Sequence, residues 1–149
     1  MPIRIERPDQ PESIALIAAL DAYLAPLYPA QSQHGLSLAA LMNPDVSFAL
    51  ARDEAGCACG CGAVVLHDDY AELKRMYVPG ERRGQGLGRA LLQFLEEHAH
   101  ARGRRVMRLE TGIHQPEALR LYAAAGYRRC PPFGEYRPVP LSVFMEKRG

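Results

Sequence analysis

Residues 82–88 read Arg-Arg-Gly-Gln-Gly-Leu-Gly and lie between an expected strand and the clearest helical pattern in the chain. Glycine at every second position from 84 to 88 permits unusual backbone angles and lets a ligand approach main-chain N–H groups. The start of the helix adds N–H groups without intrahelical partners and the positive end of a dipole. Arg82, Arg83 and Arg89 add formal positive charge. The stretch therefore predicts a binding site for phosphate groups.

Two common phosphate-binding patterns do not fit this loop. The dinucleotide pattern G-x-G-x-x-G requires glycine where Arg89 stands, and the chain contains no G-x-x-x-x-G-K-[ST]. Residues 83–88 instead fit R-x-x-G-x-G, a short pattern that an ordinary glycine-rich turn can also satisfy. The flanking sequence therefore has to decide between a binding loop and a plain turn.

Helical and strand patterns extend from the loop in both directions. Apolar residues recur at helical spacing from Leu87 to His98, and Gly103 supplies a stop. Further helices are expected at residues 11–23, 34–42 and 116–125, and strands at residues 3–5, 46–51, 57–66, 70–78, 105–111, 127–130 and 141–147. This order predicts an α+β, three-layer fold in which helices cover both faces of a mixed, mostly antiparallel sheet.

Length and composition limit the classes of protein that fit. The chain has 149 residues, which is the usual size of one domain, and we expect a single domain over residues 1–149. A formal net charge of +1 gives no indication of nucleic-acid binding. No apolar run is long enough to span a bilayer, and the N-terminus lacks an apolar secretory segment. The expectation is a cytoplasmic protein with no membrane or nucleic-acid partner.

Three of the four cysteines, Cys57, Cys59 and Cys61, form a C-x-C-x-C run in an expected strand. Alternate residues of a strand face the same side, so the run predicts three small side chains packed on one face. A zinc site usually needs C-x-x-C spacing and a second pair of ligands, neither of which the sequence shows. We therefore expect structural cysteines and no metal.

Three stretches together carry a resemblance to a known family. They are residues 83–88, residues 72–78 (Glu-Leu-Lys-Arg-Met-Tyr-Val) and residues 121–127 (Leu-Tyr-Ala-Ala-Ala-Gly-Tyr). In this order, and with the expected elements between them, they resemble the coenzyme loop, the central strand and the LYxxxGF segment of the GNAT superfamily of N-acyltransferases. Tyr127 stands where that family usually has phenylalanine. The resemblance implies the GNAT fold and an acetyltransferase that uses acetyl-CoA as cosubstrate.

The resemblance also implies which residues hold the coenzyme. Backbone groups of Met76, Tyr77 and Val78 would pair with the pantetheine arm, in a gap between the central strand and its parallel neighbour. Gln115, where relatives often carry asparagine, would be a further contact. The pyrophosphate would receive main-chain N–H groups from Arg83, Gly84, Gln85, Gly86, Leu87, Gly88 and Arg89.

The chemistry implied is a direct attack of a primary amine on the thioester, with both substrates bound together. Tyr122 matches the family's general acid. A phenol with a pKa of about 10 is protonated at neutral pH, so its proton is available for the leaving thiolate. An alkyl amine is mostly protonated at neutral pH, so a base or a water relay is needed. Glu72 occupies the position of the base in many relatives, and Glu110 on the neighbouring strand is the second candidate.

The acceptor depends on segments that vary within such a fold. We expect a small molecule or amino acid, with Tyr28, His34, Glu135 and Tyr136 as candidate contacts and Glu135 as a partner for an ammonium group. A protein or peptide acceptor, and a coenzyme A-binding module without turnover, remain alternatives. An uncovered sheet edge in the late strands invites pairing, so a homodimer is an open alternative as well.

Overall fold

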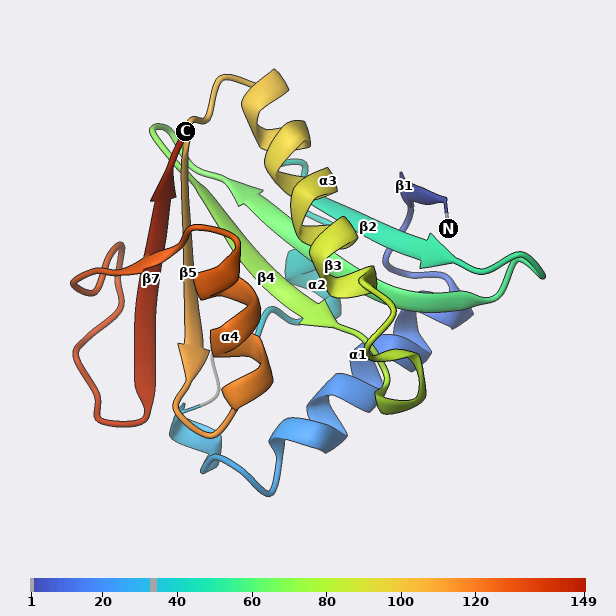
Figure 1. Cartoon of the computed structure of the whole chain (residues 1–149), viewed down its shortest axis with the longest axis horizontal. Coiled ribbons are helices and arrows are strands. Elements are labelled where there is room, and N and C mark those ends of the chain that lie inside the picture. The colour runs from blue at the N-terminus through green and yellow to red at the C-terminus, as the bar shows by residue number, and fades with distance from the viewer. Residues whose placement is uncertain (1, 33–34) are drawn as a thin grey trace.

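A seven-stranded sheet forms the centre of the molecule (Figure 1). The structure is a computed structural model that describes residues 2–32 and 35–149. Within these residues the strands follow the order β1-β2-β3-β4-β5-β7-β6. Their bounds are β1 (Ile3–Ile5), β2 (Val46–Arg52), β3 (Ala58–Leu66), β4 (Ala71–Tyr77), β5 (Val106–Gly112), β6 (Arg128–Arg129) and β7 (Ser142–Arg148). β4 and β5 pair in parallel and every other pairing is antiparallel, as expected for a mixed, mostly antiparallel sheet.

Helices cover both faces of this sheet, which confirms the three-layer expectation (Figure 1). Helix α3 (Leu87–Ala101) presents Leu87, Leu91 and Leu95 to one face, where α4 (Pro116–Ala124) also packs. Helix α1 (Pro11–Leu24) and the short α2 (Leu38–Leu41) cover the other face, where Leu16, Ile17 and Leu41 form a second buried cluster with β2 and β3. Helix α3 therefore buries one apolar stripe, as amphipathic helices do, whereas α1 also leaves the apolar Ile14 exposed.

Helix α2 is shorter than the expected span of residues 34–42. It begins at Leu38 because the Ser37 hydroxyl caps it, accepting a hydrogen bond of 3.1 Å from the Ala40 N–H. Single-turn helices η1 (Ala30–Ser32) and η2 (Gly80–Arg82) precede α2 and α3, respectively. None of the helices in the described ranges is both long and apolar enough to traverse a bilayer.

The parallel ladder between β4 and β5 is short. It joins Ala71, Glu72 and Leu73 to residues 107–109 and then stops, although both strands continue. Beyond Leu73, one residue of β3, Gly62, opposes two of β4, Arg75 and Met76, which is a β-bulge. Arg75 in this bulge has a φ of 57°. Among the residues that the structure describes, no other residue apart from glycine has a positive φ. The bulge and the end of the ladder open a gap between β4 and β5.

The C-x-C-x-C run does not lie on one face of a strand, so that expectation is wrong. Cys57 precedes β3 and is exposed, whereas Cys59 packs into the cluster under α3 and Cys61 into the cluster under α1. A register shift opposite residues 51 and 52 changes the face to which the following residues of β3 point. All four cysteines are free, and the Cys61 thiol lies 3.4 Å from the Arg75 carbonyl of the bulge.

Candidate active site

Two hollows meet in the gap between β4 and β5. The first, called here the long cleft, has a volume of about 320 Å³ and runs from the end of β4 to the start of α3. It contains every residue predicted to hold the coenzyme except Gln85. Its lining is Leu20, Tyr23, Met76, Tyr77, Val78, Arg82, Arg83, Gly84, Gly86, Leu87, Gly88, Arg89, Gln115, Glu117, Ala118, Leu121 and Tyr122.

The glycine-rich turn presents a row of unpaired main-chain donors to this cleft. Gly84 and Gly86 have φ values of 82° and 78°, a left-handed conformation that favours glycine. Within the described residues, none of the amide N–H groups of residues 84–89 donates to a protein acceptor, and the first bond of α3 runs from Ala90 N–H to Gly86 O. Unpaired N–H groups at a helix start attract anions. This turn therefore fits a diphosphate, as the sequence predicts.

Arginine side chains flank the turn in different ways. The Arg83 guanidinium lies 5.3 Å from the ring centre of Tyr23, and its Nε donates to the Val78 carbonyl at 3.1 Å. Arg89 is exposed on the first turn of α3. Arg82 instead forms an ion pair of 2.7 Å with Asp53, on the turn between β2 and β3. Arg83 and Arg89 thus bring positive charge beside the unpaired amides, although Glu117 lies 3.9 Å from Arg83.

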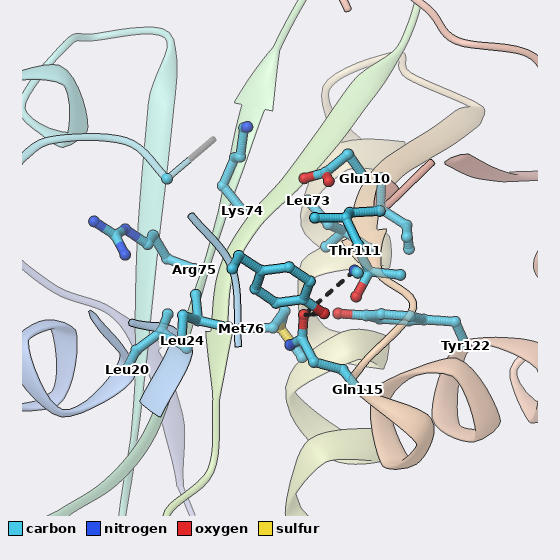
Figure 2. A pocket seen from close by; sticks show the side chains of 15 residues that line it. Leu20, Leu24, Leu73, Lys74, Arg75, Met76, Glu110, Thr111, Gln115 and Tyr122 are labelled. Atoms are coloured by element: carbon cyan, nitrogen blue, oxygen red, sulfur yellow. Dashed lines mark hydrogen bonds between the residues drawn. The ribbon is translucent and has the colours of Figure 1, made fainter. Parts of the chain in front are cut away.

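The second hollow, called here the inner pocket, is smaller, with a volume of about 100 Å³ (Figure 2). It lies on the other side of Met76, Gln115 and Tyr122, which line both hollows. Its lining is Leu20, Leu24, Tyr28, Gly35, Leu73, Lys74, Arg75, Met76, Leu109, Glu110, Thr111, Gly112, Gln115, Tyr122 and Leu141. A ligand in the long cleft can therefore present one end to a second molecule in the inner pocket.

Tyr122 stands where the two hollows meet. Its side chain is buried, and its hydroxyl points into the inner pocket beside Gln115 (Figure 2). Burial raises the pKa of this phenol, and the Glu110 carboxyl adds to the rise. In the part of the chain that the structure describes, the hydroxyl has no hydrogen-bond partner. Tyr122 is thus a protonated donor at neutral pH with its proton free for a ligand.

Gln115 organises the floor of the inner pocket. Its Oε1 accepts hydrogen bonds from the Tyr28 hydroxyl at 3.2 Å and from the Gly112 N–H at 3.3 Å. The Tyr28 oxygen in turn accepts the His114 N–H at 3.0 Å. Tyr28, predicted as an acceptor contact, therefore does line the pocket, and the hydrogen bonds hold it against the end of β5.

Glu110 is the carboxylate of the inner pocket. Burial raises its pKa to about 7, while a hydrogen bond from Ser142 and the charge of Lys74 lower it and the charge of Glu72 raises it. A carboxyl group whose pKa lies near neutrality can both accept and release a proton under working conditions. The second candidate for the base therefore lines the inner pocket with a pKa near neutrality.

Glu72 lies deeper and lines neither hollow. Its carboxylate accepts hydrogen bonds from the Tyr136 hydroxyl at 2.6 Å and from His67 Nε2 at 3.0 Å, and it pairs with Lys74 Nζ at 3.3 Å. The Tyr136 hydroxyl also contacts Lys74. Burial and the bond to Glu72 raise the pKa of Tyr136, so this phenol stays a donor. Glu72 is thus enclosed by three polar partners.

The remaining predicted acceptor contacts lie elsewhere. Glu135 is exposed and lines neither hollow, Tyr136 packs behind the pocket against Glu72, and His34 lies outside the described residues. Sequence reasoning missed Leu20 and Leu24 of α1, which form an apolar wall of the inner pocket. Their spacing of four residues places them on one helix face, but it does not tell which side of the sheet they reach. Among the described residues, no cluster of three or more His, Cys, Asp or Glu is placed to hold a metal.

Comparison with known proteins gives a consistent result. A family model described as the acetyltransferase (GNAT) family matches residues 13–127. The IAA acetyltransferase of Azospirillum brasilense is 44% identical over 144 residues, which cover 95% of this chain and 94% of that protein. A protein from Klebsiella pneumoniae, described as a candidate acyl-CoA N-acyltransferase, is 43% identical with a TM-score of 0.85, covering 99% of this chain and 96% of that one. The PaiA N-acetyltransferase from Thermoplasma acidophilum, solved in complex with coenzyme A, shares the fold at 20% identity, with a TM-score of 0.76 and full coverage of both chains.

Proposed function

The chain belongs to the acetyltransferase (GNAT) family, and from that membership we propose that it moves an acetyl group from acetyl-CoA to a primary amine of a small molecule. Its relatives are N-acetyltransferases, so the chain is an acyltransferase. The acceptor, the acyl group and the residues in the chemical steps form the proposal. The observation that carries it is the meeting of the long cleft and the inner pocket at Tyr122.

The long cleft fits acetyl-CoA at both ends. Six consecutive unpaired amides, from Gly84 to Arg89, would bind the pyrophosphate. The ladder to β5 ends at Leu73, so the edge of β4 that continues to Tyr77 has no strand partner on that side and would pair with the amide groups of the pantetheine arm. Acetyl-CoA supplies an activated thioester at the end of this path, next to Met76 and Tyr122.

Glu110 would take the proton of the acceptor's ammonium group, which restores the lone pair that attacks the thioester carbon. We favour Glu110 over Glu72 because Glu110 lines the inner pocket, whereas Glu72 is enclosed by Tyr136, His67 and Lys74. The Glu72 carboxylate contacts these three partners, and Glu72 does not line the inner pocket, so a molecule there would meet Glu110 instead. Glu72 would instead keep Lys74 and Tyr136 in place behind the pocket.

Tyr122 would give its phenolic proton to the sulfur as the carbon–sulfur bond breaks. The Tyr122 hydroxyl points into the place where the hollows join, and its raised pKa keeps the proton on the oxygen before the reaction. Donation of this proton while the bond breaks would avoid a free thiolate, which burial makes less stable than it is in water. The nitrogen of the new carbon–nitrogen bond would give its extra proton to the Tyr122 phenolate, which restores the phenol. The products are then the amide and the free thiol, and Glu110 releases the first ammonium proton to solvent.

The inner pocket favours a small acceptor. Its volume of about 100 Å³ is modest, and Leu20, Leu24 and Leu141 form apolar walls. Glu110 is the carboxyl group inside it that can receive an ammonium group. A compact primary amine with an apolar body matches this lining.

Two measurements test the proposal. Calorimetry with coenzyme A should give saturable binding, and release of free thiol from acetyl-CoA should depend on an added acceptor. The acceptor panel should hold small amines, amino acids and short peptides, together with IAA, the compound in the name of the Azospirillum relative. Transfer to peptides alone would overturn the small-molecule assignment. Absence of coenzyme A binding would overturn the role of the amide row.

A further inference from the structure

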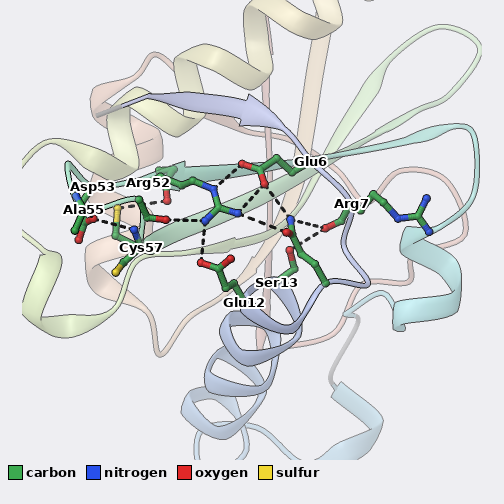
Figure 3. Close-up of polar contacts among 12 residues, drawn as sticks. Glu6, Arg7, Glu12, Ser13, Arg52, Asp53, Ala55 and Cys57 are labelled. Carbon is green, nitrogen blue, oxygen red and sulfur yellow. Dashed lines mark hydrogen bonds and ion pairs between the residues drawn. The ribbon is translucent and has the colours of Figure 1, made fainter.

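The turn between β2 and β3, residues 53–57, is held rigidly by its own hydrogen bonds (Figure 3). The Asp53 carboxylate accepts the N–H groups of Ala55 at 3.0 Å and Cys57 at 2.9 Å. The Asp53 N–H donates to the Cys57 carbonyl at 2.9 Å. Arg52 donates to the Gly56 carbonyl at 2.7 Å. These hydrogen bonds thus fix the backbone of the turn relative to the sheet.

Arg52 ties the same turn to the N-terminal part of the chain (Figure 3). Its guanidinium pairs with Glu6 at 2.8 Å and with Glu12, near the start of α1, also at 2.8 Å. The turn is therefore anchored to β2, to α1 and to the segment before α1. A side chain that pairs with this turn is therefore held in place as well.

Asp53 of this turn pairs with Arg82, which comes just before the glycine-rich turn that begins at Gly84. Arg82 Nη2 lies 2.7 Å from Asp53 Oδ2, and the side chains of Arg82 and Asp53 are 31% and 16% exposed. The neighbouring arginine lowers the pKa of Asp53, so the pair is ionised at neutral pH. Arg82 is the last residue of η2 and lies two positions before Gly84, the first of the unpaired amides.

Beyond Arg83, the glycine-rich turn makes few contacts with the rest of the protein. A Cβ atom added at Gly84 or Gly86 would meet no heavy atom within 4 Å. The amides from residue 84 to residue 89 have no protein acceptor among the described residues. Glycine loses more conformational freedom on ordering than any other residue. The shape of the amide row therefore depends on how its two ends are held, by α3 on one side and by Arg82 and Arg83 on the other.

We infer that Asp53, which touches neither hollow, is a positioning residue for acetyl-CoA: through Arg82 it holds the amide row in the shape that binds the pyrophosphate. A loop that is only partly in its binding-competent shape lowers the apparent affinity by that fraction. The ion pair raises the competent fraction before the ligand arrives. This inference rests on the proposed function, because it assumes that the amide row binds a diphosphate.

The test is calorimetry with coenzyme A on the wild-type chain, Asp53→Asn, Arg82→Gln and the double variant. Asparagine keeps a side-chain oxygen for the Ala55 and Cys57 amides, so the substitution removes the charge and leaves the turn. Loss of a partly exposed ion pair should raise the Kd of Asp53→Asn about fivefold. In the Arg82→Gln background the same change should have no further effect, because its partner is absent. In turnover, the KM for acetyl-CoA should rise while kcat stays constant.

Glu146→Gln is the matched control. It breaks the Arg108–Glu146 ion pair of 3.2 Å, whose side chains are 23% and 26% exposed, on β5 and β7 at the opposite end of the sheet. This variant should bind coenzyme A as the wild-type chain does. An unchanged or lower Kd in Asp53→Asn, or an equal effect in the Arg82→Gln background, would overturn the inference. Failure of the wild-type chain to bind coenzyme A would instead overturn the proposed function.

Discussion

The guanidinium of Arg75 lies 2.5 Å from the carboxylate of Asp21, and this contact joins the bulge of β4 to helix α1. Arg75 also donates two hydrogen bonds, of 3.0 and 2.8 Å, to the Leu36 carbonyl in the segment before α2. The residue at the bulge thus holds both elements that close the inner pocket from the N-terminal side. It does so from a left-handed backbone conformation that is unfavourable for arginine.

Replacement of Arg75 should separate its two roles. Arg75→Ala and Arg75→Gly both lose the contacts to Asp21 and Leu36, but only alanine keeps the strain of a positive φ. Arg75→Gly should therefore be about 1 kcal/mol more stable than Arg75→Ala in urea unfolding. Equal stability of the two variants would mean that the bulge relaxes once the side chain is gone.

Gly86→Ala should weaken coenzyme binding as well as stability. Gly86 has a φ of 78° at the start of α3, and alanine there costs about 1 kcal/mol of folding free energy. Gly103→Ala is the control, because Gly103 has a φ of 83° in equally open space but lies just after the far end of α3. Both variants should lose similar stability in urea, and only Gly86→Ala should raise the Kd for coenzyme A. Equal binding by both variants would contradict a role of the amide row.

Tyr122→Phe should lower kcat about 100-fold, the usual contribution of one acid–base group, and leave the Kd for coenzyme A close to that of the wild-type chain. The phenylalanine ring preserves the packing of α4 and removes only the proton donor. Thiol release under saturating acetyl-CoA measures the first quantity and calorimetry the second. A kcat within twofold of the wild-type value would remove Tyr122 from the proton-transfer step.

Tyr127→Phe should affect stability rather than chemistry. The Tyr127 hydroxyl donates to the buried carboxylate of Glu96 at 2.8 Å, and Lys147 Nζ also contacts this carboxylate at 3.2 Å. Without the phenol, Glu96 loses one partner in a buried setting, which should cost about 2 kcal/mol in urea unfolding. The Tyr127 ring lies 5.8 Å from that of Tyr122, so an unchanged kcat also serves as the control for the Tyr122 variant.

The pH dependence of turnover should identify the base. Burial raises the pKa of Glu110 from its ordinary value of 4.5 to about 7, and only the deprotonated carboxylate accepts a proton. The value of kcat/KM for the acceptor should therefore rise as the pH increases through about 7. Glu110→Gln should remove this limb and lower kcat/KM about 100-fold. Glu72→Gln should keep the limb, and loss of the limb in Glu72→Gln alone would return the role to Glu72.

The sequence predicts which residues of the glycine-rich turn and of β4 lie together at the long cleft because these parts are local. The glycine positions, the start of a helix and the end of a strand lie within a few residues of one another, so the backbone alone brings them together. All of the predicted contacts except Gln85 line the long cleft, and Tyr122 faces it from a helix that the sequence also places. Local chemistry of this kind does not depend on knowing how distant segments pack.

The base and the acceptor contacts could not be predicted in the same way. Glu72 and Glu110 lie on adjacent parallel strands, and the sequence does not reveal which one Tyr136 and His67 enclose. Tyr136 lies 64 residues from Glu72 in the chain, so its contact depends on tertiary packing. The faces of Cys59 and Cys61 were missed for a related reason, since a register shift between paired strands leaves no local mark.

The shortness of the β4–β5 ladder has a mechanical consequence. Three residue pairs connect the half-sheet of β1–β4 to the half-sheet of β5–β7, whereas seven pairs connect β2 to β3. Because so few residue pairs join them, we expect the two half-sheets to rotate about this ladder more easily than either half-sheet bends. The angle between the two half-sheets would then determine the width of the long cleft. A bound ligand that contacts both half-sheets would in turn fix this angle.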